Sequence, residues 1–189
     1  MRADERRLPE AVRAWKEVAE GRRFAKDTPK LADAQRRLAS AHELQGMWEQ
    51  ALTARQSAAA AFAQCHLPGE AAAERIAAAA HLHGAGHFTS ALDLVSAALD
   101  DADRSGRVDL KARALALRGA ILGKLGRIDA GRDSVQAGLS LALENNLIGP
   151  AAEAYHWLAS VYEQAGDYIG ARDAYQSAFE FCSARGVAA

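Results

Sequence analysis

Apolar positions along the chain recur with the period of an α-helix. In the segment 151–164, large and small apolar residues at the i, i+3, i+4, i+7 spacing are Tyr155, Leu158, Ala159 and Tyr162. A second periodic stretch, 168–184, carries on one stripe Ala171, Tyr175, Ala178, Phe179 and Cys182. Gly166 stands between the two stretches, and glycine commonly closes a helix in the left-handed conformation. The pattern therefore predicts a pair of helices joined by a tight turn.

The same two-helix pattern returns every forty residues. The breaks are marked by Gly46, Gly86, Gly126 and Gly166, and two places further on stand Trp48, Phe88, Ile128 and Tyr168. Seven residues before each glycine, and five and twelve residues after it, only alanine or glycine occurs. Small residues let helix backbones approach closely where they cross. The sequence therefore predicts stacked helix pairs with alanine and glycine at the crossings.

This register divides the chain into modules. A half repeat is expected at 1–27, followed by repeats at 28–67, 68–107, 108–147 and 148–189. We expect them to form one all-α domain, a right-handed α-solenoid of antiparallel helix pairs, with linkers such as 145–150 between repeats. The half repeat lacks its first helix and neither end has a clear polar cap. We therefore expect either a fragment of a longer protein or a homodimer formed through an uncapped terminal helix.

Composition and charge narrow the classes of partner. The chain contains 46 alanines and 15 glycines, and only 6% of its residues are aromatic, which favours helices packed on helices. Its 23 basic and 24 acidic residues provide no positive excess, so we expect no direct contact with nucleic acid. No apolar run reaches the roughly 18 residues of a membrane span, and no signal peptide is evident. Cys65 and Cys182 match no disulfide or zinc pattern, so we expect a cytoplasmic protein.

Catalytic and metal-binding motifs are not found in the sequence. His81 and His83 lie two residues apart on a predicted helix and point to different sides, and glycines interrupt the helix before His87. The run 119–125 has the wrong spacing for a phosphate loop and leucine where serine or threonine is required. We therefore expect no metal, no cofactor and no enzymatic activity.

The signature of the repeats resembles that of the tetratricopeptide repeat (TPR) family. Repeat four is the best match, at Tyr155, Leu158, Ala159, Tyr162, Gly166, Asp167, Tyr168, Ala171, Tyr175 and Ala178. Arg75 departs from the pattern, where an aromatic residue is usual, and so does Arg118, where leucine is usual. The family's usual period is 34, and we expect the six extra residues to lengthen the second helix and its linker. Long repeats of this kind resemble those of bacterial LuxR-type and multidomain ATPase regulators.

The resemblance implies that a protein or peptide binds on the concave face formed by the first helices. Carried over by register, the groove positions are Arg36, Ser40, Glu43, Ile76, Ala80, His83, Ala116, Ala120, Gly123, His156, Ser160 and Glu163. The middle of this groove is apolar and its ends are polar, which suits an apolar helix or an extended peptide. Trp157 lies beside these positions and is a further candidate, whereas Trp15 and Trp48 fall in core columns.

Two classes of function stay open. The first is a protein- or peptide-binding scaffold whose ligand lies on the concave face. The second is an effector-sensing segment of a larger signalling or transcriptional regulator, linked to an ATPase, cyclase or DNA-binding domain. In either case a segment of the protein itself could fill the groove. A reading frame that extends beyond these ends would favour the second class.

Overall fold

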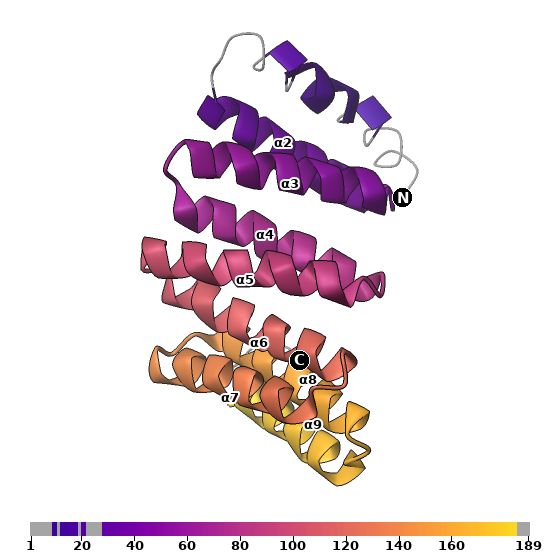
Figure 1. Ribbon diagram of the computed structural model, residues 1–189, viewed down its shortest axis with the longest axis vertical. Helices are drawn as coiled ribbons and strands as arrows, with labels where there is room; N and C mark the ends of the chain where they lie inside the picture. Colours follow the sequence, from indigo (N-terminus) through magenta and orange to yellow (C-terminus); the bar gives the residue numbers. More distant parts are fainter. Residues whose placement is uncertain (1–8, 11, 19, 22–27, 185–189) are drawn as a thin grey trace.

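The computed structural model describes residues 9–10, 12–18, 20–21 and 28–184, and these residues contain helices and no strand. After helical residues within 9–21, the helices are α2 (Thr28–Leu44), α3 (Trp48–Gln64), α4 (Pro68–Gly84), α5 (Phe88–Ser105), α6 (Val108–Lys124), α7 (Ile128–Glu144), α8 (Ile148–Gln164) and α9 (Tyr168–Ser183). From α2 to α6 they follow one another along the long axis of the molecule, and α7, α8 and α9 lie together at the far end (Figure 1). The all-α solenoid expected from the sequence is confirmed.

The turns between helices repeat their backbone geometry. The glycines that mark the period, Gly46, Gly86, Gly126 and Gly166, all have positive φ, between 70° and 82°. After each, the next amide donates to a carbonyl five residues earlier, as from Met47 N to His42 O at 2.9 Å. This bond satisfies a carbonyl that the helix end would leave unpaired. In the turn before α4 the left-handed residue is His66 (φ 57°), and in the turn before α8 it is Asn146 (φ 54°). Neither residue was predicted from the sequence to have this conformation.

The extra length of the repeat is shared by both helices. Within the first of the four helix pairs, α2 and α3 have 17 residues each, so the expected lengthening of the second helix alone is wrong. The expected linker 145–150 is also shorter than predicted, because α8 begins at Ile148 and includes Pro150 in its first turn. Proline is tolerated there because the first turn of a helix needs no amide donor.

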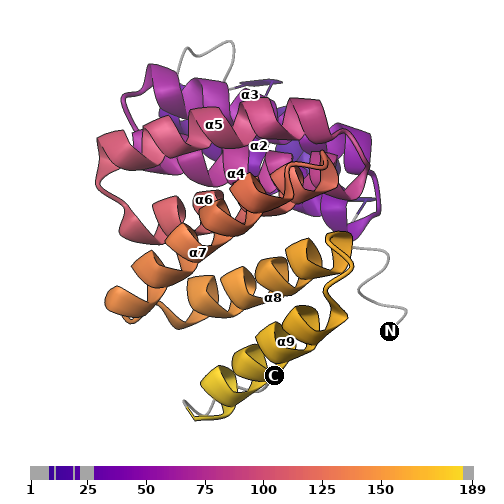
Figure 2. The same cartoon turned by 60° about the horizontal axis from the view of Figure 1, so that its bottom comes forward.

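The cores between layers are built largely from small side chains. The predicted small positions Ala39, Ala79 and Ala159 are 0% exposed, and Ala171 is 3% exposed. Larger side chains fill the spaces between them, as in the core that joins α4, α5 and α6 through Ile76, Val95, Leu117 and Ile121. Figure 2 shows α7 and α9 inclined to the direction of α3 and α5, so the stack is twisted.

The helices α6 and α7 cross at glycines and approach each other closely. A Cβ added at Gly119 would stand 2.4 Å from Val135 Cγ2 and 2.5 Å from the carbonyl oxygen of Gly131. On the opposite helix, a Cβ at Gly138 would stand 2.6 Å from the carbonyl oxygen of Ala112. The two backbones therefore touch, and no residue with a side chain fits at these positions.

Two departures from the TPR signature have polar partners in the structure. Arg75 forms an ion pair with Asp101 of α5, whose side chain is 2% exposed. Arg118 donates from Nε to Ser134 Oγ at 3.0 Å, and Ser134 donates in turn to the carbonyl oxygen of Leu115 at 2.8 Å. Each basic residue that replaces an apolar one is thus matched by a polar residue on the second helix of its pair.

Candidate functional site

A pocket opens between three consecutive first helices, α4, α6 and α8. Its volume is about 140 Å³, and its lining residues are Ala73, Ile76, Ala77, Ala80, Arg113, Leu117, Glu153 and Trp157. Positions forty residues apart recur in this lining, as in the series Ala77, Leu117 and Trp157. The pocket is therefore built by the repeat itself. Its floor is apolar, and at its rim Arg113 Nε donates to Glu153 Oε2 at 2.9 Å.

Two histidine rings contact the indole ring of Trp157. The ring of His83, on α4, meets it edge-on with 5.2 Å between centroids, and the ring of His156 meets it at the same centroid distance. His83 also packs against Phe88 at 5.6 Å. The contact between His83 and Trp157 joins α4 to α8 across α6. Three predicted site residues, Ile76, Ala80 and Trp157, thus line one pocket, and His83 supports it.

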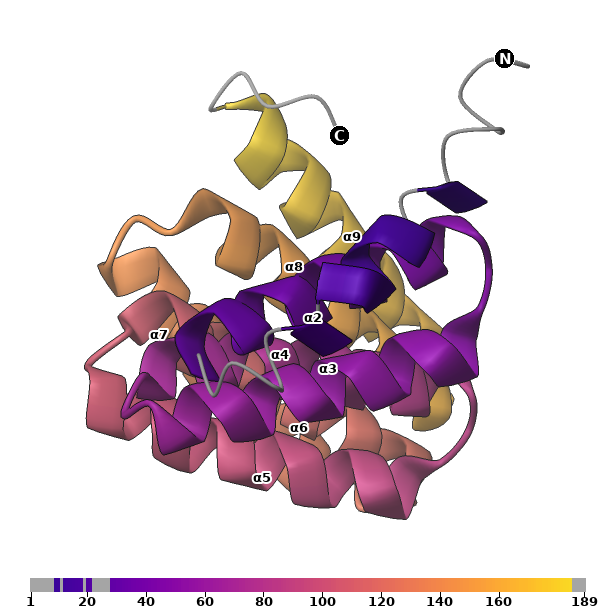
Figure 3. The ribbon, with the colours of Figure 1, turned by 90° about the horizontal axis from the view of Figure 1, so that it is seen from above.

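The predicted groove residues of repeat three are buried, which corrects their assignment to an open groove. Ala116 is 0% exposed and Ala120 2% exposed, and Gly123 is buried as well. A Cβ at Gly123 would stand 3.3 Å from Val161 Cγ2, so α8 lies directly against α6. The small residues that were expected to floor a trough instead let two first helices close on each other. Figure 3 shows the stack from above.

The predicted residues of repeat one take part in an ion-pair network. Arg36 Nε donates to Glu74 Oε1 at 2.7 Å, and Arg36 also pairs with Glu70. From α3, Arg55 donates to Glu43 Oε1 at 2.5 Å and to Glu74 Oε2 at 2.7 Å. Glu74 is 3% exposed. Arg36 and Glu43 therefore hold α2, α3 and α4 together, and a ligand would have to displace these partners to use them.

His81 belongs to the same network. Its Nε2 lies 2.6 Å from Glu43 Oε1, and its ring packs against Trp48 at 5.5 Å between centroids. Burial acts to raise the pKa of Glu43, but hydrogen bonds from Arg55 and His81 and their charges outweigh it and lower the pKa. Among the described residues, no group of three histidine, cysteine, aspartate or glutamate side chains is arranged to hold a metal ion.

The remaining predicted positions lie at the edges. Ser40 and His156 are exposed, Ser160 is partly buried, and Glu163 accepts a hydrogen bond from Tyr175 Oη at 3.2 Å. Trp48 is 58% exposed, so its assignment to the core is wrong. Trp15 does pack, against the cluster of Leu38 and Ala54. None of the helices in the described part of the chain is long and apolar enough to cross a membrane.

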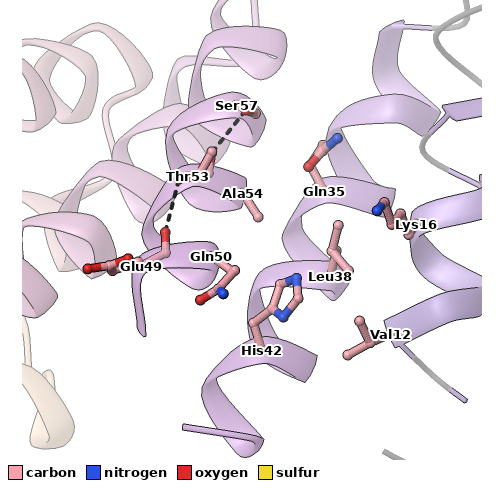
Figure 4. A pocket seen from close by; sticks show the side chains of 10 residues that line it. All are labelled: Val12, Lys16, Gln35, Leu38, His42, Glu49, Gln50, Thr53, Ala54 and Ser57. Atoms are coloured by element: carbon pink, nitrogen blue, oxygen red, sulfur yellow. Dashed lines mark hydrogen bonds between the residues drawn. The ribbon is translucent and has the colours of Figure 1, made fainter. Parts of the chain in front are cut away.

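A larger pocket, of about 590 Å³, lies between α2, α3 and the helical residues before them, and it was not predicted from the sequence (Figure 4). It is lined by Val12, Lys16, Gln35, Leu38, His42, Glu49, Gln50, Thr53, Ala54 and Ser57. Forty residues on, the equivalents of Ala54 and His42 are Leu94 and Leu82. His42, which stands where the next repeat has leucine, adds a polar group to the lining of this pocket. The column of Ala54 does not single out this pocket, because the equivalent Ser134 and Ala174 are also small.

The outer face of α9 differs from those of α5 and α7. Phe179 is 61% exposed and Tyr175 40%, whereas their equivalents Leu99 and Val135 are 9% and 0% exposed. Tyr175 and Phe179 lie on the predicted apolar stripe of this helix, but they are exposed because no helix of the described chain follows α9 to cover them. Pairing of a terminal helix by a second copy stays a prediction.

The stability of the protein is expected to decrease in mild acid through His83. Burial lowers the pKa of His83 below its usual 6.5, and the charge of Lys124 lowers it further. The unfolded chain then binds a proton at higher pH than the folded chain does. The contribution of a neutral His83 is therefore complete above pH 6.5 and is lost as the pH falls towards the folded pKa.

Measurement of the free energy of unfolding in urea at about pH 7.5 and about pH 5.5 checks this direction of the pH dependence. His83→Gln should lose less stability between the two pH values than the unmodified protein does. A smaller loss will remain, because burial and Lys16 also lower the pKa of His42. Equal losses in the two proteins would contradict the expectation.

Comparisons with solved structures identify the class of fold. The structure of BtubC (BKLC) from P. vanneervenii superposes with a TM-score of 0.77 at 18% identity, covering 100% of this chain and 78% of that one. A Rap protein complexed with Competence and Sporulation Factor gives 0.73 at 18% identity, covering 95% of this chain and 50% of the Rap chain. A Podosopora anserina putative kinesin light chain with TPR-like repeats superposes with a TM-score of 0.71 at 14% identity. The match covers 96% of this chain and 90% of that one.

These neighbours define the protein as a TPR-like helical-repeat solenoid. At such identities the likeness concerns the fold alone, and the chain spans half the length of the Rap protein. No protein-family model and no curated protein matches the sequence.

Proposed function

We propose that the protein is a scaffold that binds a protein or peptide on its concave face, at the pocket between α4, α6 and α8. The observation that carries the proposal is this pocket itself: three first helices contribute to it at equivalent positions, and its apolar floor is open to solvent at Ala80. A Rap protein of similar fold has been crystallised in complex with Competence and Sporulation Factor, which supports a binding role for this fold. Apolar floors with paired polar groups at the rim are typical of peptide-binding grooves.

Ala80→Glu tests the proposal. Ala80 is exposed, so a glutamate there should leave the helices folded while it places a charge at the mouth of the pocket. Peptides are first selected from a displayed random library on the immobilised protein. Their affinity for this variant should be at least about tenfold lower, since the apolar contact of a peptide side chain with the pocket is worth more than about 1.4 kcal/mol.

The matched control is Ala137→Glu, which adds the same charge at an exposed alanine of α7. Ala120→Glu is unsuitable, because Ala120 is 2% exposed and a buried charge would unfold the protein. A library that yields no peptide whose binding depends on Ala80 would overturn the proposed function.

A further inference from the structure

We propose that the pocket between α4, α6 and α8 receives one large apolar side chain of an extended partner peptide, and that Lys124 pairs with a carboxylate three residues away along that peptide. The inference rests on the proposed function and specifies the chemistry of its partner.

The size and lining of the pocket select a single side chain. Its volume of about 140 Å³ is below the roughly 300 Å³ at which sites for drug-sized molecules begin, and it is close to the roughly 150 Å³ of a cavity that takes up benzene. Arg113 and Glu153 at the rim pair with each other. A polar group inserted between Ile76, Ala77 and Leu117 would find no partner, so the side chain must be apolar.

The contact between His83 and Trp157 selects an extended backbone. Their rings meet 5.2 Å apart across the face of α6. A helical ligand has a diameter of roughly 10–12 Å with its side chains, which is too wide to reach the pocket floor beside this contact. An extended segment is narrow enough to pass over it and insert one side chain.

Charge identifies the second feature of the peptide. Along the four first helices, many ionic side chains pair within the chain, as in Asp33 with Arg37, Lys111 with Asp103, and Arg113 with Glu153. Lys124 is exposed at the last turn of α6, and in the described part of the chain it forms no ion pair. Its charge also helps to lower the pKa of His83, whose ring contacts Trp157 at the pocket. A carboxylate on the ligand complements it.

Helix geometry gives the spacing between the two features. Lys124 follows Leu117 by seven residues, which places it on the same face about 10.5 Å further along α6. An extended peptide advances roughly 3.3 Å per residue, so three residues span this distance. The expected pattern is therefore a large apolar residue and an acidic residue three positions apart.

Two blocked hexapeptides test the pattern, acetyl-Gly-Leu-Gly-Gly-Asp-Gly-amide and the reverse order, acetyl-Gly-Asp-Gly-Gly-Leu-Gly-amide. Binding is followed by the fluorescence of Trp157 in a Trp15→Phe, Trp48→Phe variant. At least one order should give a saturable change, and exchange of its leucine for alanine should weaken binding about tenfold. Exchange of its aspartate for asparagine should weaken binding about threefold at low salt, and this difference should disappear at high salt.

Lys124→Gln should abolish the preference for aspartate over asparagine, whereas Lys111→Gln, on the same helix, should keep it. The inference is overturned if neither order saturates, if the alanine peptides bind equally well, or if Lys124→Gln keeps the preference. Library peptides that require Ala80 while the hexapeptides fail would leave the proposed function standing. Failure of both experiments would overturn both.

Discussion

Gly119→Ala is expected to destabilise the protein by about 2 kcal/mol, although alanine is the better helix former by about 1 kcal/mol. The added Cβ would stand 2.4 Å from Val135 Cγ2 and 2.5 Å from the carbonyl oxygen of Gly131. A valine methyl can rotate away, but a backbone oxygen moves only if α7 moves with it. The two helices would therefore have to separate, and urea unfolding would report the loss as a lower midpoint.

Gly84→Ala is the matched control for this prediction. Gly84 is also helical, at the end of α4, but nothing lies within 4 Å of the Cβ that alanine would add. Here only helix propensity acts, so the change should be neutral or stabilise the protein by up to about 1 kcal/mol. If both substitutions shifted the midpoint in the same direction and by similar amounts, the close approach of α6 and α7 would be contradicted.

The positions of the turns and helix crossings could be predicted because each repeat presents the same local requirement. A left-handed turn residue needs glycine or a tolerant substitute, and a crossing needs a small residue, so Gly126 and Ala159 stand in columns that the sequence displays directly. The positive φ of His66 and Asn146 could not be predicted in this way, because neither residue is a glycine.

The groove could be predicted only in part, because a small residue on a first helix serves either an open face or a close contact. Ala80 and Ala120 occupy the same column, yet Ala80 is exposed and Ala120 is 2% exposed. The difference depends on how closely α8 approaches α6, which the sequence of one repeat does not specify. The ion pairs of Arg36 and Glu43 could not be predicted for a similar reason, since their partners Glu74 and Arg55 lie on other helices.

Arg75 and Asp101 show that a departure from a repeat signature can be compensated within the same repeat. The two residues are 26 positions apart, one on each helix of the pair, and the equivalent positions forty residues later hold Leu115 and Leu141. In the last repeat they hold Tyr155 and Phe181, whose rings pack with 5.9 Å between centroids. One pair of positions thus carries an ion pair in one repeat and an aromatic contact in another.

Asp101→Leu alone is expected to destabilise the protein by about 3–5 kcal/mol, because it leaves the Arg75 guanidinium without its carboxylate in a largely buried site. Asp101 is 2% exposed, and its second partner, Arg104, is 67% exposed and can turn to solvent. Arg104→Leu, the control, should therefore change the free energy of unfolding by less than about 1 kcal/mol.

The double variant Arg75→Leu, Asp101→Leu is expected to recover most of the stability that Asp101→Leu loses. Replacement of a buried ion pair by packed apolar residues is often neutral or stabilising, since it removes the desolvation of two charges. One repeat later, the protein itself has leucine at both equivalent positions, Leu115 and Leu141. Urea unfolding of the wild-type protein, both single variants and the double variant should give a coupling energy of several kcal/mol, and a coupling near zero would show that the two residues act independently.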